Sequence, residues 1–173
     1  MANTKIPNEL LELGAKAFGT SSIMIGDTTT GTIDAANYNT GVGVDVFAAL
    51  TTGDDNTVMG FGAGDALTTG ARSTFVGTNA GGATTTANNN VGVGTDALLV
   101  NTTGASNVAV GKSALDANTT GNDNTGLGTL ALSANTTASN NVAVGRSALL
   151  ANTTGAGNTA VGKSSMAATT TGA

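Results

Sequence analysis

The residue types that carry most enzyme chemistry are scarce in this chain. It contains no histidine and no cysteine, which excludes cysteine nucleophiles, histidine-based triads, disulfides and thiolate zinc sites. Charged residues make up only 10% of the sequence and aromatic residues 3%. We therefore expect that the protein is not an enzyme and that it has no catalytic, cofactor or metal site.

The remaining motifs with chemical potential have simpler structural explanations. Asp54, Asp55 and Asp123 lie in expected turns, where carboxylates could bind calcium, but their spacing does not repeat as a solenoid calcium motif would. Solvated turn carboxylates are the favoured interpretation. The stretches GVGVDVF and GFGAG resemble pieces of phosphate loops, yet no G-x-x-x-x-G-K-[ST] motif is present.

The net charge of −5 and the dispersed cations argue against nucleic-acid binding. Lys112, Arg146 and Lys163 share one position of an internal repeat. They are either ordinary exposed residues, which we favour, or a basic stripe that binds an anionic glycan on a host surface. No apolar run approaches the length of a membrane span, so we expect no membrane insertion. The opening MANTKIPNELLELGAKAF lacks the features of a secretory signal, which favours a protein produced in the cytoplasm.

The dominant feature of the chain is a 17-residue repeat. Residues 107–121 read NVAVGKSALDANTTG, residues 141–155 read NVAVGRSALLANTTG, and Asn158 begins NTAVGKSS. We number the places of each unit from 1 to 17, starting at Ser22, so that nine units fit without an insertion. Place 5 is then always glycine: Gly26, Gly43, Gly60, Gly77, Gly94, Gly111, Gly128, Gly145 and Gly162.

An apolar residue precedes each of these glycines at place 4, and Ile, Val or Thr stands at place 2. This alternation predicts a short strand with one buried face in every unit. We expect the place 4 residues to stack into a dry, continuous spine. Its valines are Val42, Val76, Val93, Val110, Val144 and Val161.

The second half of each unit predicts a turn. Place 12 of four later units is an asparagine followed by Thr-Thr and then Gly or Ala, which is turn chemistry. The asparagines also head N-x-T glycosylation sequons, but these recur because the turn recurs. They are Asn101, Asn118, Asn135 and Asn152.

The connector between strand and turn predicts a helical or 3₁₀ turn. Four later units carry leucine at place 9, whereas two early units carry Leu50 and Leu67 at place 12. A shift of three places keeps a side chain on one face of a helical turn but moves it to the other face of a strand.

These units predict a mainly β fold, a β-solenoid or β-roll of nine layers in which each layer contacts its neighbours. Glycine would let the backbones turn closely, and the Asn and Thr columns would hydrogen-bond along the axis. One valine, one leucine and several alanines per layer make a thin core. We therefore expect several chains to associate along their apolar edges as an intertwined or side-by-side homotrimer.

The unit NVAVGxSALxANTTG, with NTGLG at Asn124 and NTAVG at Asn158, resembles the NTAVGxxAL...NTTG repeats of bacteriophage tail-fibre and other virion proteins. More distantly it is similar to the left-handed β-roll heads of trimeric autotransporter adhesins. The resemblance covers residues 22–173 and implies a homotrimeric fibre shaft or head located in the virion. No membrane-anchor segment follows the repeats, which favours a phage protein over an adhesin.

Residues 1–21 do not follow the repeat and form a separate capping or attachment segment. Pro7 suits the first turn of a short helix, Gly14 can end it, and an apolar stripe lies between. Such a helix would either cap the first layer or bind other virion proteins. The residues expected to make that attachment are Ile6, Pro7, Leu10, Leu11 and Leu13.

The sequence therefore favours a structural virion protein, either a fibre or a capsid or tail decoration, that projects from the particle and aids host attachment. A bacterial surface adhesin head is the first alternative. An ice-binding solenoid is the second, because threonine fills places 13 and 14 in every unit from the second onward. Those threonines are adjacent in a turn, whereas a flat ice-binding strand places them two apart.

Overall fold

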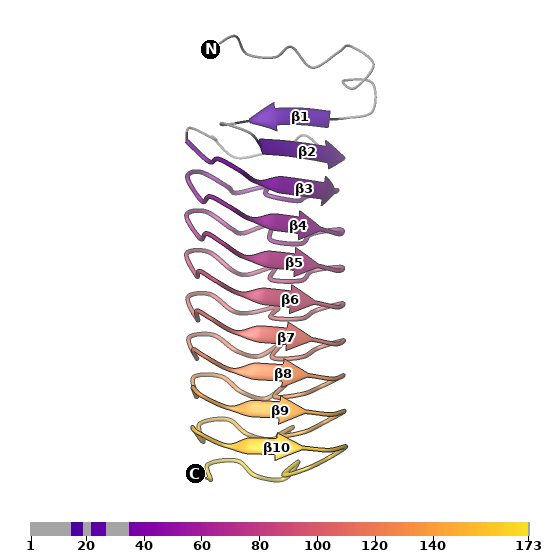
Figure 1. Ribbon diagram of the computed structural model, residues 1–173, viewed down its shortest axis with the longest axis vertical. Coiled ribbons are helices and arrows are strands. Elements are labelled where there is room, and N and C mark those ends of the chain that lie inside the picture. Colours follow the sequence, from indigo (N-terminus) through magenta and orange to yellow (C-terminus); the bar gives the residue numbers. More distant parts are fainter. Residues whose placement is uncertain (1–14, 19–21, 27–34, 173) are drawn as a thin grey trace.

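The fold is a β-solenoid in which each 17-residue unit makes one turn (Figure 1). It is a computed structural model that describes residues 15–18, 22–26 and 35–172. One sheet contains ten strands in sequence order: β1 (Ala15–Phe18), β2 (Ser22–Gly26), β3 (Thr40–Gly43), β4 (Thr57–Met59), β5 (Thr74–Val76), β6 (Val91–Val93), β7 (Val108–Val110), β8 (Thr125–Leu127), β9 (Val142–Val144) and β10 (Thr159–Val161).

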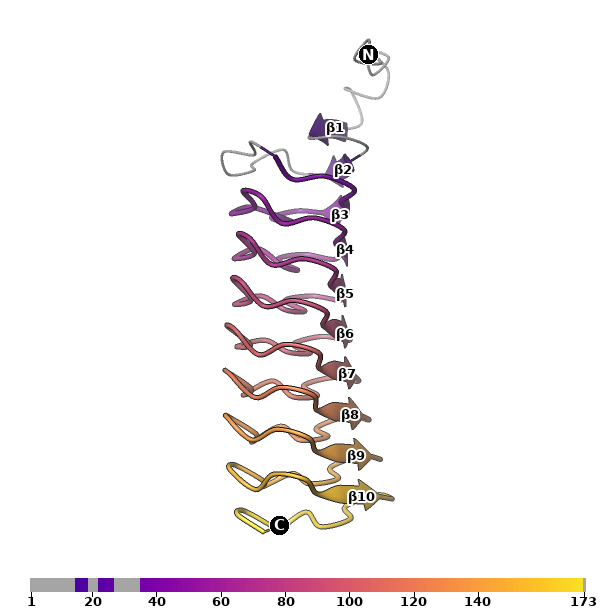
Figure 2. The ribbon, with the colours of Figure 1, turned by 60° about the vertical axis from the view of Figure 1, so that its left-hand side comes forward.

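Strands β2 to β10 are parallel and pair in the register that the repeat predicts. Val93 pairs with Val110, and Val110 pairs with Leu127, so each residue lies beside its equivalent seventeen positions along the chain. The view in Figure 2 shows the same stacking in the loops that close each turn behind the sheet. The predicted repeat solenoid is therefore confirmed.

The buried side of each strand differs from the predicted one. The middle residue of the strand, at place 3, points into the solenoid: Ala109 and Ala143 are fully buried. The predicted spine at place 4 lies on the outward side instead, where Val110 is 39% and Val161 69% exposed and the other four are partly exposed: Val42, Val76, Val93 and Val144.

The narrow interior of the solenoid explains why place 3, and not place 4, points inward. Places 1, 8, 9, 12 and 15 also point inward in most units, which leaves room for only a small residue at place 3 where place 9 is leucine. A large residue points inward at place 3 or place 9 where the other of these two places is glycine, as in the pairs Phe75 with Gly81 and Phe47 with Gly41. A Cβ added to Gly81 would lie 2.6 Å from the ring of Phe75, and one added to Gly41 would lie 2.9 Å from that of Phe47.

The predicted helical turn in the connector is wrong, because the described residues contain no helix. In the fifth unit, for example, two backbone bonds of the i to i+3 type are present, from Ala97 to Gly94 and from Asn101 to Leu98. Between them, however, Asp96 and Leu98 adopt left-handed φ angles of 58° and 56°. Alternating left-handed residues interrupt right-handed winding. The leucines at place 9 and place 12 nevertheless both point inward, as Leu98 and Leu50 show.

Two columns of buried asparagines run along the solenoid, as the sequence predicts. At place 1, Asn124 donates from Nδ2 to Asn107 Oδ1 (3.1 Å) and to the Ala138 carbonyl (2.8 Å). Its own Oδ1 accepts from the backbone amide and the side chain of Asn141. At place 12, Asn118 donates to Asn101 Oδ1 and to the Gly121 carbonyl. These side chains replace backbone hydrogen bonds at the corners, where the sheet ends.

The N-terminal segment is described only in part. Strand β1 pairs antiparallel with β2, so it covers the edge of the first parallel strand (Figure 1). The predicted helix and the five predicted attachment residues lie outside the described residues. They are Ile6, Pro7, Leu10, Leu11 and Leu13.

Candidate interaction face

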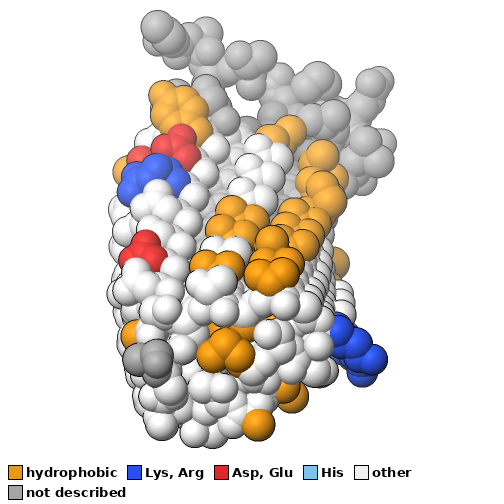
Figure 3. All heavy atoms as spheres, turned by 60° about the horizontal axis from the view of Figure 1, so that its bottom comes forward, with side chains coloured by type: hydrophobic (Ala, Val, Ile, Leu, Met, Phe, Trp, Pro, Cys, Tyr) orange, Lys and Arg blue, Asp and Glu red, His pale blue; other side chains and the backbone are white. Residues whose placement is uncertain are grey.

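The outward side of the parallel strands is the most unusual surface of the molecule. It is formed by places 2 and 4 of each unit from β2 to β10, and we call it the sheet face. None of these eighteen positions carries a charge. Large apolar side chains on it are well exposed, including Ile25 at 41%, Met59 at 48% and Leu127 at 37%. Figure 3 shows hydrophobic side chains in two columns along this face, with charged side chains to either side.

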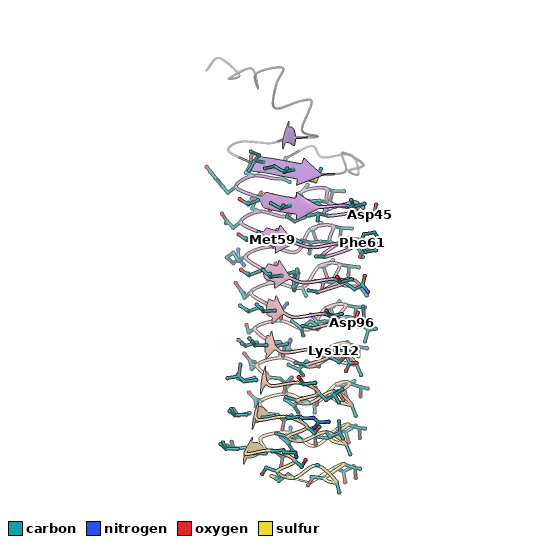
Figure 4. All side chains as sticks on the ribbon, turned by 90° about the vertical axis from the view of Figure 1, so that its right-hand side faces the viewer. Asp45, Met59, Phe61, Asp96 and Lys112 are labelled. Atoms are coloured by element: carbon teal, nitrogen blue, oxygen red, sulfur yellow. The ribbon has the colours of Figure 1, made fainter. Side chains whose placement is uncertain are left out.

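Two rims border the sheet face. Place 17 precedes each strand and forms the strand-start rim, while place 6 follows each strand and forms the strand-end rim. Because β2 to β10 are parallel, all residues of one rim lie on the same side. Figure 4 looks onto the strand-end side and labels Phe61 and Lys112 there.

Four of the five cations among the described residues lie on these rims, and the fifth, Lys16, lies in β1. Lys112, Arg146 and Lys163 are exposed on the strand-end rim, so all three lie on one side of the solenoid, which fits both ordinary exposed residues and the alternative of a basic stripe. Arg72 lies on the strand-start rim and donates from Nε to Asn89 Oδ1 at 2.8 Å. The charges therefore flank the apolar face without entering it.

Near the N-terminal end of the solenoid the apolar surface extends onto both rims. Val44 is 45% and Phe61 57% exposed on the strand-end rim, and Tyr38 is 59% exposed on the strand-start rim. The apolar surface, counting the sheet face and both rims, is therefore broadest over β3 and β4 and narrows toward β10.

The threonine columns are used differently from an ice-binding surface. The hydroxyl at place 13 donates to the backbone carbonyl of the equivalent threonine in the next unit, as Thr102 does to Thr119 at 3.0 Å. The place 14 threonines are exposed, whereas those at place 13 are only partly exposed, apart from Thr170 in the last unit. One column of free hydroxyls cannot form the two-column flat array that the ice-binding alternative needs.

Other predicted site residues serve structural roles. The sequon asparagines are fully buried: Asn101, Asn118, Asn135 and Asn152. Asp54 accepts a hydrogen bond from the backbone amide of Asn37 at 2.7 Å. In the described part of the chain, no three acidic, histidine or cysteine side chains gather into a metal site, and no helix there could cross a membrane.

Asp116 is the carboxyl group that fits its surroundings least well. Burial raises its pKa, and the nearby Asp96 raises it further, although the backbone amides of Asp116 and Ala117 lower it. Its buried Oδ1 has no hydrogen-bond partner in the described structure. Because the folded pKa lies above the unfolded one, the resulting destabilisation is absent below the unfolded pKa and develops as pH rises through the folded pKa.

We expect Asp116→Asn to stabilise the protein at pH 7 by at most about 0.5 kcal/mol, because it removes a poorly solvated charge whose effect is reduced by solvent screening at this half-exposed position. At pH 3 the carboxyl group is protonated, so the gain should vanish. Urea unfolding at both pH values measures this difference. Asp55→Asn, at an exposed carboxyl group, is the control and should give no comparable gain at pH 7. An equal gain for Asp116→Asn at both pH values would contradict the role of burial.

The chain matches no known protein-family model, no curated protein and no solved structure.

Proposed function

We propose that this chain is a structural protein of a bacteriophage virion, a fibre or a capsid or tail decoration, in which three copies form a projecting rod. The observation that carries the proposal is the uncharged apolar sheet face, which runs along the whole solenoid. A contiguous apolar surface of this length is rare on a monomer and typical of a surface that another molecule covers.

The construction of the solenoid supports a mechanical role. Backbone amides donate to carbonyls of neighbouring units at nearly every place, as Leu98 does to Ala114 and Val108 to Asn124. The buried asparagine columns add side-chain hydrogen bonds between units. Such a molecule keeps a fixed length and direction, which suits a spacer or display surface.

The asymmetry of the chain supports attachment through the N-terminal segment. Ile6, Leu10, Leu11 and Leu13 form the only dense apolar stripe outside the repeats. A short amphipathic segment from each of three chains would fit a three-fold socket on a particle. In this proposal the repeats project away from that socket, and host-surface glycans are a further partner for the exposed rims.

Deletion of residues 1–14 tests attachment, because it leaves strand β1 in place over β2. We expect the truncated protein to remain a folded trimer but to be absent from purified virions that contain the full-length protein. The measurement is incorporation into virions in parallel with circular dichroism and light scattering. Normal incorporation of the truncated chain would show that attachment resides in the repeats. If the full-length protein were also missing from virions, the virion role itself would be wrong.

A further inference from the structure

We propose that the sheet face is the surface through which three copies of this chain bind one another. The three solenoids would be parallel, with their sheet faces turned toward a common axis along the rod. This inference rests on the trimer of the proposed function and adds which surface makes it and in which orientation the copies associate.

The distribution of residue types on the face is that of an interface. Its centre holds Val, Ile, Leu, Met and Thr without a charge, while Lys112 and Asp123 lie on opposite rims. Interfaces combine a core depleted of charge with a polar, solvent-exposed rim. A sheet face exposed to water would instead carry mainly polar residues.

The size of the face is also sufficient. Eighteen partly exposed side chains, at about 50 Å² each, would bury about 900 Å² per chain, shared between its two neighbours in the trimer, whereas one pairwise standard interface buries about 800 Å² per partner. The two neighbouring copies together therefore cover about as much of one chain as one side of a standard interface, without any contribution from the rest of the solenoid.

The rims indicate parallel rather than inverted copies. Rotation about an axis along the rod brings the strand-end rim of one copy beside the strand-start rim of the next. The chain rises by one layer every seventeen residues. In height along the rod, a strand-end residue of one copy therefore lies between two strand-start residues of the next copy: the one that precedes the equivalent strand and the one that precedes the following strand. At three of these levels apolar meets apolar, cation meets aromatic ring, and cation meets carboxylate, while Asp55 lies between Val44 and Phe61. The three pairs are Val44 with Tyr38, Phe61 with Arg72, and Lys112 with Asp123.

An inverted arrangement would bring like rims together. The strand-end rim carries Val44 and Phe61 toward one end of the solenoid and Arg146 and Lys163 toward the other. Inversion would therefore set the cations Arg146 and Lys163 toward the exposed apolar side chains Val44 and Phe61. The chemistry of the rims favours the parallel arrangement.

The assignment of the face is tested by two matched substitutions. Val110 on the sheet face and Val100 on another side are almost equally exposed, at 39% and 36%. Val110→Asp would place three carboxylates near the common axis, so we expect the midpoint concentration for trimer dissociation to rise at least about 100-fold. Val100→Asp should change it by less than about threefold. Analytical ultracentrifugation measures both, with circular dichroism to check the fold of each variant.

A trimer that persists in Val110→Asp, or that dissociates equally in both variants, would overturn this assignment and leave the trimer itself standing. A wild-type chain that is monomeric would overturn the trimer of the proposed function. The two failures are therefore distinguishable in the same experiment.

The parallel orientation is tested by exchanging two rim charges. Lys112→Glu and Asp123→Lys should each weaken the trimer about tenfold, because three rim pairs are broken at once and each exposed pair is worth little. The double variant should return to within about threefold of the wild type, since the pair is restored with reversed polarity. Additive weakening in the double variant would overturn the parallel orientation.

Discussion

Gly111→Ala is expected to lower the free energy of unfolding by about 4 kcal/mol, a large effect for one methyl group. Gly111 has a φ of 133°, where an alanine is strained. Its added Cβ would also lie 2.6 Å from the carbonyl carbon of Gly128 in the next unit. Since that atom belongs to the backbone, the two units would have to separate. Chemical denaturation of the variant and the wild type measures the loss.

Gly162→Ala separates the two causes of this loss. Gly162 occupies the same place of the last unit with a φ of 120°, but its added Cβ would meet no atom within 4 Å. It should cost about 1–2 kcal/mol, from backbone strain alone. If both variants lost equal stability, close stacking would not be the reason for the glycine column.

Asn124→Asp is the second substitution with a large expected effect, about 3–5 kcal/mol at pH 7. Asn124 is fully buried and its Nδ2 donates to Asn107 Oδ1 and the Ala138 carbonyl. A carboxylate cannot donate to either. Burial would raise the pKa of the new carboxyl group, so the loss should be smaller below the unfolded pKa and should grow as pH rises through the folded pKa. Urea unfolding at pH 3 and pH 7 measures the loss.

Asn122→Asp is its control two residues away. Asn122 is exposed and uses its Oδ1 to accept from the backbone amide of Ala105 at 2.7 Å. Aspartate keeps that acceptor, so we expect a change below about 0.5 kcal/mol. Similar losses in both variants would mean that the asparagine column contributes no more than an exposed amide.

The repeat predicts the solenoid because the residues that shape each turn lie close together in sequence and recur with a fixed period. A strand of three residues, a glycine such as Gly111 and an inward asparagine such as Asn118 recur every seventeen residues, and equivalent residues must then stack. The parallel register, such as Val93 beside Val110, follows directly from that period. The asparagine columns and the close approach at the glycines were predictable for the same reason.

The inside and outside of the strand were not predictable from hydrophobicity. Val108 and Val110 are larger and more apolar than Ala109 between them, so the alternation pointed to the wrong side. The space that Leu115 and the inward asparagines leave inside the solenoid decides which side of the strand points inward. That space is set only when the seventeen residues close into one turn. The left-handed Leu98 escaped prediction similarly, because leucine rarely adopts that conformation.

The molar mass of the intact chain in solution tests the account most directly. Light scattering at micromolar concentration should give three times the 16.5 kDa of one chain, because the sheet face is covered only by association. A stable, folded particle of 16.5 kDa at all concentrations would contradict the account, since the apolar face would then be exposed to water in the native protein.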